Sequence, residues 1–176
     1  MEIKIDILKE FFDNPEKDFY IRELSKILGI NHTTVSQYLK KLVEDGYLER
    51  IKEDIYPKYR AKISKKFLNY KLFYNLEKLR LSGIVDDLEK FYDYPVIVLF
   101  GSYSHSLDLI GSDIDLCIIT EIKKEFRAAK YEKMLGRDVS LHLFNRSGWK
   151  KSKEKNPELV NSISQGLVVS GEFEVV

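Results

Sequence analysis

Residues 96–120 read VIVLFGSYSHSLDLIGSDIDLCIIT, and this stretch decides the fold of the second half of the chain. An apolar run of strand length comes directly before a Gly-Ser turn, and a second such run follows further along the chain. Asp113 and Asp115 lie at the start of this second run. The pattern predicts strand, tight turn, short helix, loop and strand. Residues two apart on a strand point to the same face, so these two carboxylates should lie side by side. They would repel each other without a cation between them, which predicts a Mg²⁺ site beside a turn that can hold phosphate.

Strand-like and helix-like segments alternate around this stretch. A long helical pattern comes first, at residues 67–92, with a kink expected at Gly83. After Pro95 the sequence predicts strands at 96–100, 113–120 and 138–144, and helices at 125–135 and 157–163. A short basic helix or loop is expected at 149–155, and a short strand or extended end at 167–170.

The run GSYSHSLDLIGSDIDL, residues 101–116, resembles the nucleotidyltransferase superfamily, in particular its minimal members. Their signature is a Gly-Ser turn followed at a fixed distance by Ser-Asp-x-Asp-Leu, and both parts stand here at that spacing. The resemblance extends over about residues 84–173. It implies an α/β nucleotidyltransferase fold with a small mixed sheet flanked by helices. It also implies transfer of a nucleoside monophosphate from an NTP, with ATP expected as the donor.

The resemblance assigns roles to five residues of this motif. Asp113 and Asp115 match the catalytic metal ligands, and Mg²⁺ held there would clamp the attacking and leaving oxygens. Gly101, Ser102 and Ser112 match the nucleotide-binding residues. Gly101 lets the backbone approach a phosphate closely, and Ser102 offers its hydroxyl and nearby N–H groups.

Two positions depart from the family's pattern, and the first lies in the turn. The family often has Arg-Gly four and five residues after the glycine, where this chain has His105 and Ser106. Loss of the arginine removes a contact with phosphate or with neighbouring side chains. His105 either replaces that contact in part or is simply exposed, and the sequence leaves both open.

The second departure concerns a third carboxylate, which the family usually places in a Val-Asp-Leu run of a later strand. The matching run here is Val-Ser-Leu, with Ser140 in the centre. Asp138 lies two residues earlier on the same strand face, so it is the candidate for the third catalytic and metal-binding acid. The alternative is that Asp138 only begins the strand and pairs with Arg137. His142 shares this face and is expected to line the site.

The first third of the chain has the layout of a helix-turn-helix followed by a wing. A helix is expected at 21–28, and Asn31 can cap a second helix. Strands at 47–51 and 56–63 should surround a polar tip at residues 52–54. The run VSQYLKKLVEDGYLER, residues 35–50, resembles winged-helix regulators of the ArsR and MarR type, over about residues 5–63. It implies an α+β winged helix-turn-helix domain that binds DNA.

Polar residues on the second helix are candidates for DNA contact. Thr and Ser reach phosphates, Gln reads adenine and Lys neutralises phosphate, which selects Thr33, Thr34, Ser36, Gln37 and Lys40. The alternative is a solvated helix face in a domain used for docking or dimerisation. Residues 1–62 hold 12 basic and 12 acidic side chains, so non-specific DNA affinity should be weak unless the basic segment 58–80 helps.

Composition adds limits on organisation and location. The 176 residues carry a net charge of +1, and Cys117 is the only cysteine, so no disulfide forms within the chain. No apolar run approaches the roughly 20 residues that span a bilayer, and no signal peptide is recognisable, so we expect a cytoplasmic protein without a membrane partner.

The sequence predicts a winged-helix domain at 1–63, a helical connector at 64–93 and a nucleotidyltransferase domain at 94–176. The connector also offers a surface for a homodimer.

Two functions from different classes remain open. The first is an Mg²⁺-dependent enzyme that transfers NMP, with AMP expected, to a protein or small molecule and is coupled to a DNA-binding domain. Family members of this kind include antitoxins that modify a HEPN-type toxin. The second is a transcriptional regulator whose second domain senses a nucleotide without turnover. The departures at His105 and Ser140 favour the second function.

Overall fold

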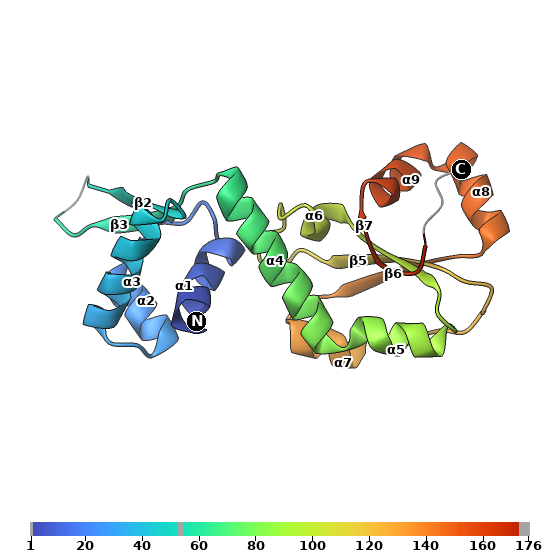
Figure 1. Cartoon of the computed structure of the whole chain (residues 1–176), viewed down its shortest axis with the longest axis horizontal. Coiled ribbons are helices and arrows are strands. Elements are labelled where there is room, and N and C mark those ends of the chain that lie inside the picture. The colour runs from blue at the N-terminus through green and yellow to red at the C-terminus, as the bar shows by residue number, and fades with distance from the viewer. Residues whose placement is uncertain (1, 53–54, 173–176) are drawn as a thin grey trace. The chain divides into compact units, whose positions relative to one another are not determined.

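The computed structural model describes residues 2–52 and 55–172, and the chain divides into two compact units (Figure 1). Unit 1 comprises Met1–Lys71 and unit 2 comprises Leu72–Val176. Residues 53 and 54, expected at the tip of the wing, lie outside the described residues. The division at residues 63 and 93 that the sequence predicts remains a proposal.

Unit 1 is a winged helix. Its helices are α1 (Glu2–Asp13), α2 (Ile21–Leu28) and α3 (His32–Glu44), and its antiparallel sheet has the order β1 (Phe19–Tyr20), β3 (Lys58–Ala61) and β2 (Leu48–Ile51). The side chain of Asn31 accepts a hydrogen bond of 2.8 Å from the Thr34 N–H, so the predicted N-cap of α3 is confirmed. Leu24, Val35 and Leu39 are fully buried and join the two helices of the motif.

Helix α4 (Lys65–Ser82) starts in unit 1 and continues into unit 2. In unit 1 the ring of Phe67 packs edge-on against Phe12 of α1, with ring centroids 5.1 Å apart. The buried Lys71 ammonium donates a 2.8 Å hydrogen bond to the Phe12 carbonyl near the end of α1. A cation is favourable at the negative end of a helix dipole, so Lys71 fastens the two helices together.

The helical pattern at 67–92 forms two helices. Helix α5 (Ile84–Phe91) follows α4 after Gly83, which has a φ of +74°. Glycine adopts this left-handed conformation without the strain that a side chain brings. The kink predicted at Gly83 is therefore a complete break, and it turns Ile84 and Leu88 into the core of unit 2.

Unit 2 is built on a mixed sheet of four strands, as the sequence predicts. The strands are β4 (Val96–Phe100), β5 (Ile114–Ile119), β6 (Val139–Phe144) and β7 (Leu167–Ser170), in the order β6-β5-β4-β7. Strands β5 and β6 are parallel, and β4 is antiparallel to both β5 and β7.

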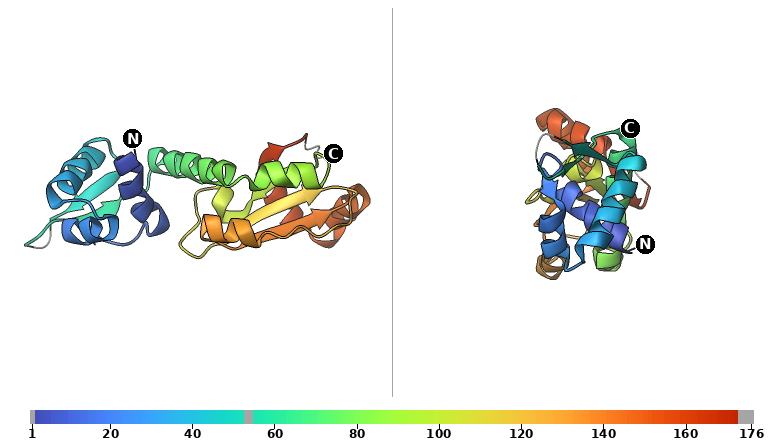
Figure 2. Two further views of the ribbon diagram at one scale, coloured as in Figure 1. Left: turned by 90° about the horizontal axis from the view of Figure 1, so that it is seen from below. Right: turned by 90° about the vertical axis from the view of Figure 1, so that its left-hand side faces the viewer.

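Helices cover both faces of this sheet. Helices α5 and α7 (Ala129–Leu135) lie below it in Figure 1, and α8 (Arg146–Lys155) and α9 (Pro157–Ser164) lie above it. The view from below in Figure 2 places α5 and α7 in front of the strands. The lower core contains Ile97, Leu99 and Leu116, and the upper core contains Val98, Phe100, Cys117 and Trp149. Burial raises the pKa of the Cys117 thiol to about 12, so this cysteine is an unreactive part of the core.

Helix α7 begins later than the sequence predicts. The helical pattern indicates a start at residue 125, whereas the helix starts at Ala129. The hydroxyl of Tyr92 donates to the Lys124 carbonyl at 2.8 Å, and the ring of Phe126 stacks on Tyr131 at 5.7 Å. The first of these contacts, with a residue far away in the sequence, helps to hold the preceding segment in an irregular conformation.

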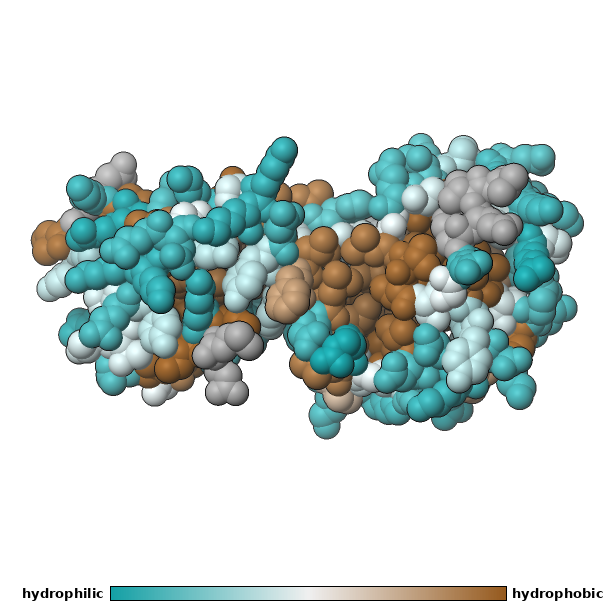
Figure 3. All heavy atoms as spheres, viewed as in Figure 1, coloured by the Kyte–Doolittle hydropathy of each residue, from teal (hydrophilic) through white to brown (hydrophobic). Residues whose placement is uncertain are grey.

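The surfaces of the two units differ in character. Figure 3 shows mainly polar residues on the visible face of unit 1, and an area of hydrophobic residues on unit 2 next to α4. On α4 the side chains of Phe73 and Leu81 are 57% and 66% exposed. Among the described residues, no helix has both the length and the hydropathy required to cross a bilayer.

Candidate functional site

The Gly-Ser turn lies directly against one of the predicted carboxylates. Gly101 begins the short helix α6 (Gly101–Ser104) immediately after β4, with a φ of +70°. A Cβ atom at this position would lie 2.5 Å from Oδ2 of Asp115, which is closer than any side chain can approach. The preceding residue, Phe100, pairs with Asp115 in the sheet register. The absence of a side chain at Gly101 therefore brings the two halves of the motif into one site.

The two carboxylates of the motif have different environments. Asp113 is exposed and precedes β5, whereas the Asp115 side chain lies within the strand and is 28% exposed. Burial raises the pKa of Asp115; the nearby His142 opposes this effect and the charge of Asp113 adds to it. An ionised Asp115 is thus poorly solvated, and a bound cation would stabilise its charged form.

The neighbouring strand β6 places Ser140, and not Asp138, beside Asp115. The register pairs Asp115 with Ser140, and the Ile114 N–H donates to the Asp138 carbonyl at 2.9 Å. Asp138 lies just before the strand and is exposed, at the same end as Asp113. Arg137, the alternative partner expected for Asp138, forms an ion pair with Asp108 at 3.0 Å.

His142 lies closer to the acid pair than its expected role as a lining residue implies. Its Nε2 atom is 3.6 Å from Oδ1 of Asp115, and its ring packs edge-on against Phe100 at 5.1 Å. The contact is an ion pair only when the imidazole is protonated. Two-residue alternation on β6 predicted the shared face, but only the parallel register of β5 and β6 brings this imidazole to Asp115.

Within residues 2–52 and 55–172, no cluster of three or more His, Cys, Asp or Glu side chains has a geometry that could hold a metal ion. The structure therefore does not bring Asp113, Asp115 and Asp138 together as a metal-binding cluster. Asp113 and Asp138 are exposed at the ends of their strands, and Asp115 lies one step further along β5. Like charges separate when no cation lies between them.

Both serines predicted to bind nucleotide take part in turns. The carbonyl of Ser102 accepts hydrogen bonds from the backbone N–H groups of His105 and Leu107, at 3.2 and 3.0 Å. The hydroxyl of Ser112 accepts a 3.0 Å hydrogen bond from the Leu109 N–H, which closes the loop before Asp113. A hydroxyl group that accepts one hydrogen bond can also donate one, so Ser112 could donate to a phosphate oxygen.

The two residues at the Arg-Gly positions of the family differ in burial. His105 is exposed, and the two alternatives for its role stay open. Ser106 is buried and has a φ of +60°, the left-handed conformation for which the family's glycine is suited. The turn therefore holds a serine in a backbone conformation that favours glycine.

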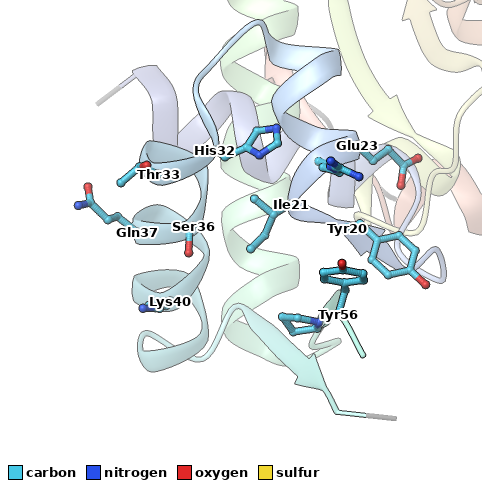
Figure 4. Close-up of a pocket in the computed structure, with 11 residues that line it drawn as sticks. Tyr20, Ile21, Glu23, His32, Thr33, Ser36, Gln37, Lys40 and Tyr56 are labelled. Carbon is cyan, nitrogen blue, oxygen red and sulfur yellow. The ribbon is translucent and has the colours of Figure 1, made fainter. Parts of the chain in front are cut away.

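A groove of about 880 Å³ runs along α3 in unit 1 (Figure 4). Four of the five residues predicted to contact DNA line it, at positions that share one face of a helix: Thr33, Ser36, Gln37 and Lys40. The backbone of the fifth, Thr34, bonds to Asn31, and its side chain is not part of the groove lining. The prediction missed Arg22 and Tyr56, which belong to α2 and to the wing and reach this groove only in the fold.

Comparisons with known proteins match a family model to each half of the chain. The family model described as a nucleotidyltransferase domain matches residues 76–169, and the MarR family model matches residues 6–54. No curated protein matches the chain. Among solved structures, HmgR from Pseudomonas aeruginosa is similar at 16% identity with a TM-score of 0.33. That match covers 72% of this chain and 49% of HmgR, so the chain spans about half the length of that protein.

Proposed function

The chain belongs to the nucleotidyltransferase domain family, with a MarR-type winged helix before that domain, and we propose that it transfers a nucleoside monophosphate to an acceptor. The donor is an NTP, with ATP favoured, and the acceptor is a protein or a small molecule. The observation that carries this proposal is the close approach of the Gly101 backbone to Asp115, because it joins a turn suited to phosphate and a partly desolvated carboxylate in one site.

The chemistry of the residues present fits a divalent cation, since the candidate ligands are carboxylates and burial disfavours the free ionised form of Asp115. Because the three acids do not form a metal-binding cluster in the structure, their side chains would have to come together around the cation. Asp113 and Asp115 would hold Mg²⁺, with Asp138 as the third acid. A bound Mg²⁺ neutralises the triphosphate and stabilises the attacking and leaving oxygens. The hydroxyls of Ser102 and Ser112 would donate hydrogen bonds to phosphate oxygens, and Gly101 leaves the space that the nucleotide needs.

The test of this proposal is transfer of label from α-³²P NTPs in the presence of Mg²⁺, followed by intact mass measurement of candidate acceptors. All four NTPs are compared for the wild type and for the double variant Asp113→Ala/Asp115→Ala. Label that depends on both aspartates supports the proposal. Equal labelling by wild type and double variant would sink it.

A second function is favoured by Ser140, which stands beside Asp115 where active relatives carry an acid. In this alternative the domain binds NTP and changes the DNA affinity of the winged helix without turnover. Saturable NTP binding with no transfer to any acceptor would identify this sensing function.

Ser140→Asp is expected to increase transfer about tenfold, which corresponds to about 1.4 kcal/mol of barrier. The new carboxylate would lie beside Asp115 in the sheet register and add an acid at the position where the family usually carries one. The rate is measured over a Mg²⁺ titration. Ser140→Asn has nearly the same shape without the charge and is the control, and an equal rate for both variants would contradict the prediction.

For the winged helix we propose DNA binding through the groove along α3. Lys40→Ala should weaken binding to all DNA sequences and reduce the slope of log K against log salt by about 1. Gln37→Ala should relax preference at one base pair, by about 1–3 kcal/mol. Both are measured by fluorescence anisotropy with DNA from the chain's own promoter region. Thr34→Ala, on the same helix but outside the groove lining, is the control, and an unchanged salt slope for Lys40→Ala would argue against this groove.

Because the family includes antitoxins that modify a HEPN-type toxin, such a toxin is one candidate for the protein acceptor. The hydrophobic area near α4 suggests a homodimer. Both belong to the proposal. Co-purification with a small helical protein encoded by a neighbouring gene, together with its gain of one nucleotide in mass, would support the first. Light scattering of the purified chain decides the second.

A further inference from the structure

Four buried polar side chains hold the loop between the Gly-Ser turn and the aspartates. Asp108 lies in this loop, Arg137 precedes β6, Tyr103 belongs to α6 and Asn75 belongs to α4. The side chains of Asp108 and Arg137 are 0% and 6% exposed, and Asn75 and Tyr103 are also buried. We call these four residues the loop network.

Arg137 fixes the end of the loop that leads into Asp113. Its Nη2 atom lies 3.0 Å from Oδ2 of Asp108, and its Nη1 atom donates to the carbonyls of Leu109 and Ser112 at 2.6 and 3.0 Å. The planar fork of a guanidinium can make these bonds together in one geometry. The carbonyl of Ser112 is part of the peptide bond to Asp113, so Arg137 constrains the backbone next to that carboxylate.

Asn75 fixes the other end, at the Gly-Ser turn. Its Nδ2 atom donates to Oδ1 of Asp108 at 2.9 Å and to the Tyr103 carbonyl at 3.2 Å. The Tyr103 hydroxyl donates in return to the Asn75 carbonyl at 3.3 Å. Because Asp108 accepts from both Asn75 and Arg137, one carboxylate connects the backbone of the turn to the backbone before Asp113.

Stability alone is a weak reason for this arrangement. Removing two charges from water is costly, and apolar residues of similar volume often give equal or greater stability. A buried ion pair does give a defined geometry, because its hydrogen bonds are directional. None of the network side chains belongs to the proposed cation or nucleotide site, so we expect the network to act on that site through the backbone that it holds.

We infer that Asp108, Arg137 and Asn75 are positioning residues for nucleotidyl transfer, and this inference rests on the proposed function. They fix the backbone at Tyr103 and Ser112 so that the turn and the two aspartates meet the same nucleotide. Groups that orient metal ligands typically contribute about 10–100-fold to metal affinity or activity. The network should therefore contribute to kcat and to cation affinity, with little effect on the KM for NTP.

The first variant is Arg137→Lys. A lysine keeps a charge opposite Asp108 but, as a point charge on a flexible stem, cannot reproduce the fork to one carboxylate and two carbonyls. We expect kcat to fall about 10–100-fold, with a similar loss of Mn²⁺ affinity measured by electron paramagnetic resonance with a non-hydrolysable ATP analogue. The control is Arg80→Lys, because Arg80 forms an exposed ion pair with Glu77 on α4 at 2.7 Å.

The double variant Asp108→Leu/Arg137→Met guards against loss of folding. It replaces the buried ion pair with apolar side chains, which such sites often tolerate. We expect a folded protein, as judged by circular dichroism and thermal melting, that has the same low kcat and Mn²⁺ affinity as Arg137→Lys. A folded double variant with wild-type kcat and Mn²⁺ affinity would show that the network is structural only.

The outcomes separate this inference from the proposed function. A wild type that binds no Mn²⁺ with the analogue and transfers nothing overturns the proposed function, and the inference with it. If the wild type transfers the nucleotide and both variants keep its kcat and Mn²⁺ affinity, the inference is overturned and the proposed function stands. If the wild type binds Mn²⁺ and the analogue without transfer, a 10–100-fold loss of Mn²⁺ affinity in both variants supports the inference, and an unchanged affinity overturns it.

Discussion

Asp115→Asn is expected to slow nucleotidyl transfer about 10²–10³-fold, the effect of removing one preorganised electrostatic group. The amide is neutral and a weaker cation ligand than the carboxylate, while its shape is almost the same. Asp115 lies against Gly101, and because the amide has nearly the same shape as the carboxylate, the substitution leaves the packing of the turn intact. Loss of activity should therefore come from charge and not from rearrangement.

The same variant should raise the melting temperature of the cation-free protein at neutral pH. Burial raises the pKa of Asp115 in the folded state above its unfolded value. The ionised carboxylate therefore destabilises the fold fully above the folded pKa, and this effect disappears as the pH falls below the unfolded pKa. Melting curves without divalent cations, at neutral and at acidic pH, check this sign. The increase over wild type should be present at neutral pH and absent at acidic pH.

The control for Asp115→Asn is Asp86→Asn, which removes an exposed carboxylate from the first turn of α5. It should leave the transfer rate unchanged and should not raise the melting temperature. Both variants are assayed under single-turnover conditions at saturating NTP. An Asp115→Asn protein that transfers as fast as the control would contradict the assignment of Asp115 as a cation ligand.

Local signals predicted most elements of both units. The N-cap at Asn31 and the break at Gly83 are set by single residues that act on their own backbone. The start of α7 could not be predicted in this way. Tyr92 holds the carbonyl of Lys124 from 32 residues away, and such a contact leaves no periodic pattern in the segment that it reshapes.

In the candidate site, too, the residues identified by local patterns were predicted, and the contacts that depend on the fold were not. The family spacing identified Gly101, Asp113 and Asp115, and two-residue alternation placed Ser140 and Asp138 at the start of the strand predicted at 138–144, although β6 begins only at Val139. The partner of Ser140 depends on the parallel register of β5 and β6, which no single strand encodes. The loop network was out of reach, because Asp108 and Arg137 are 29 residues apart and a buried ion pair has no sequence signature.

Gly101→Ala is expected to reduce both stability and transfer. An alanine with a φ of +70° costs about 1–2 kcal/mol of unfolding free energy, since its Cβ crowds the neighbouring carbonyl. Its Cβ would also lie 2.5 Å from Oδ2 of Asp115, so the carboxylate must move. A displacement of about 1 Å in a reacting group can cost about 10²-fold in rate, and transfer should fall by this amount. Chemical denaturation and single-turnover transfer measure the two effects.

Gly83→Ala separates the two causes, because Gly83 has nearly the same φ, +74°, and an added Cβ there meets no atom within 4 Å. It should lose about the same 1–2 kcal/mol of stability and keep its transfer rate. The difference in rate between the two alanine variants then measures the displacement of Asp115 alone. If Gly101→Ala transfers as fast as Gly83→Ala, close contact between the turn and Asp115 is not needed for transfer. If only Gly101→Ala is slow, that contact is part of the site.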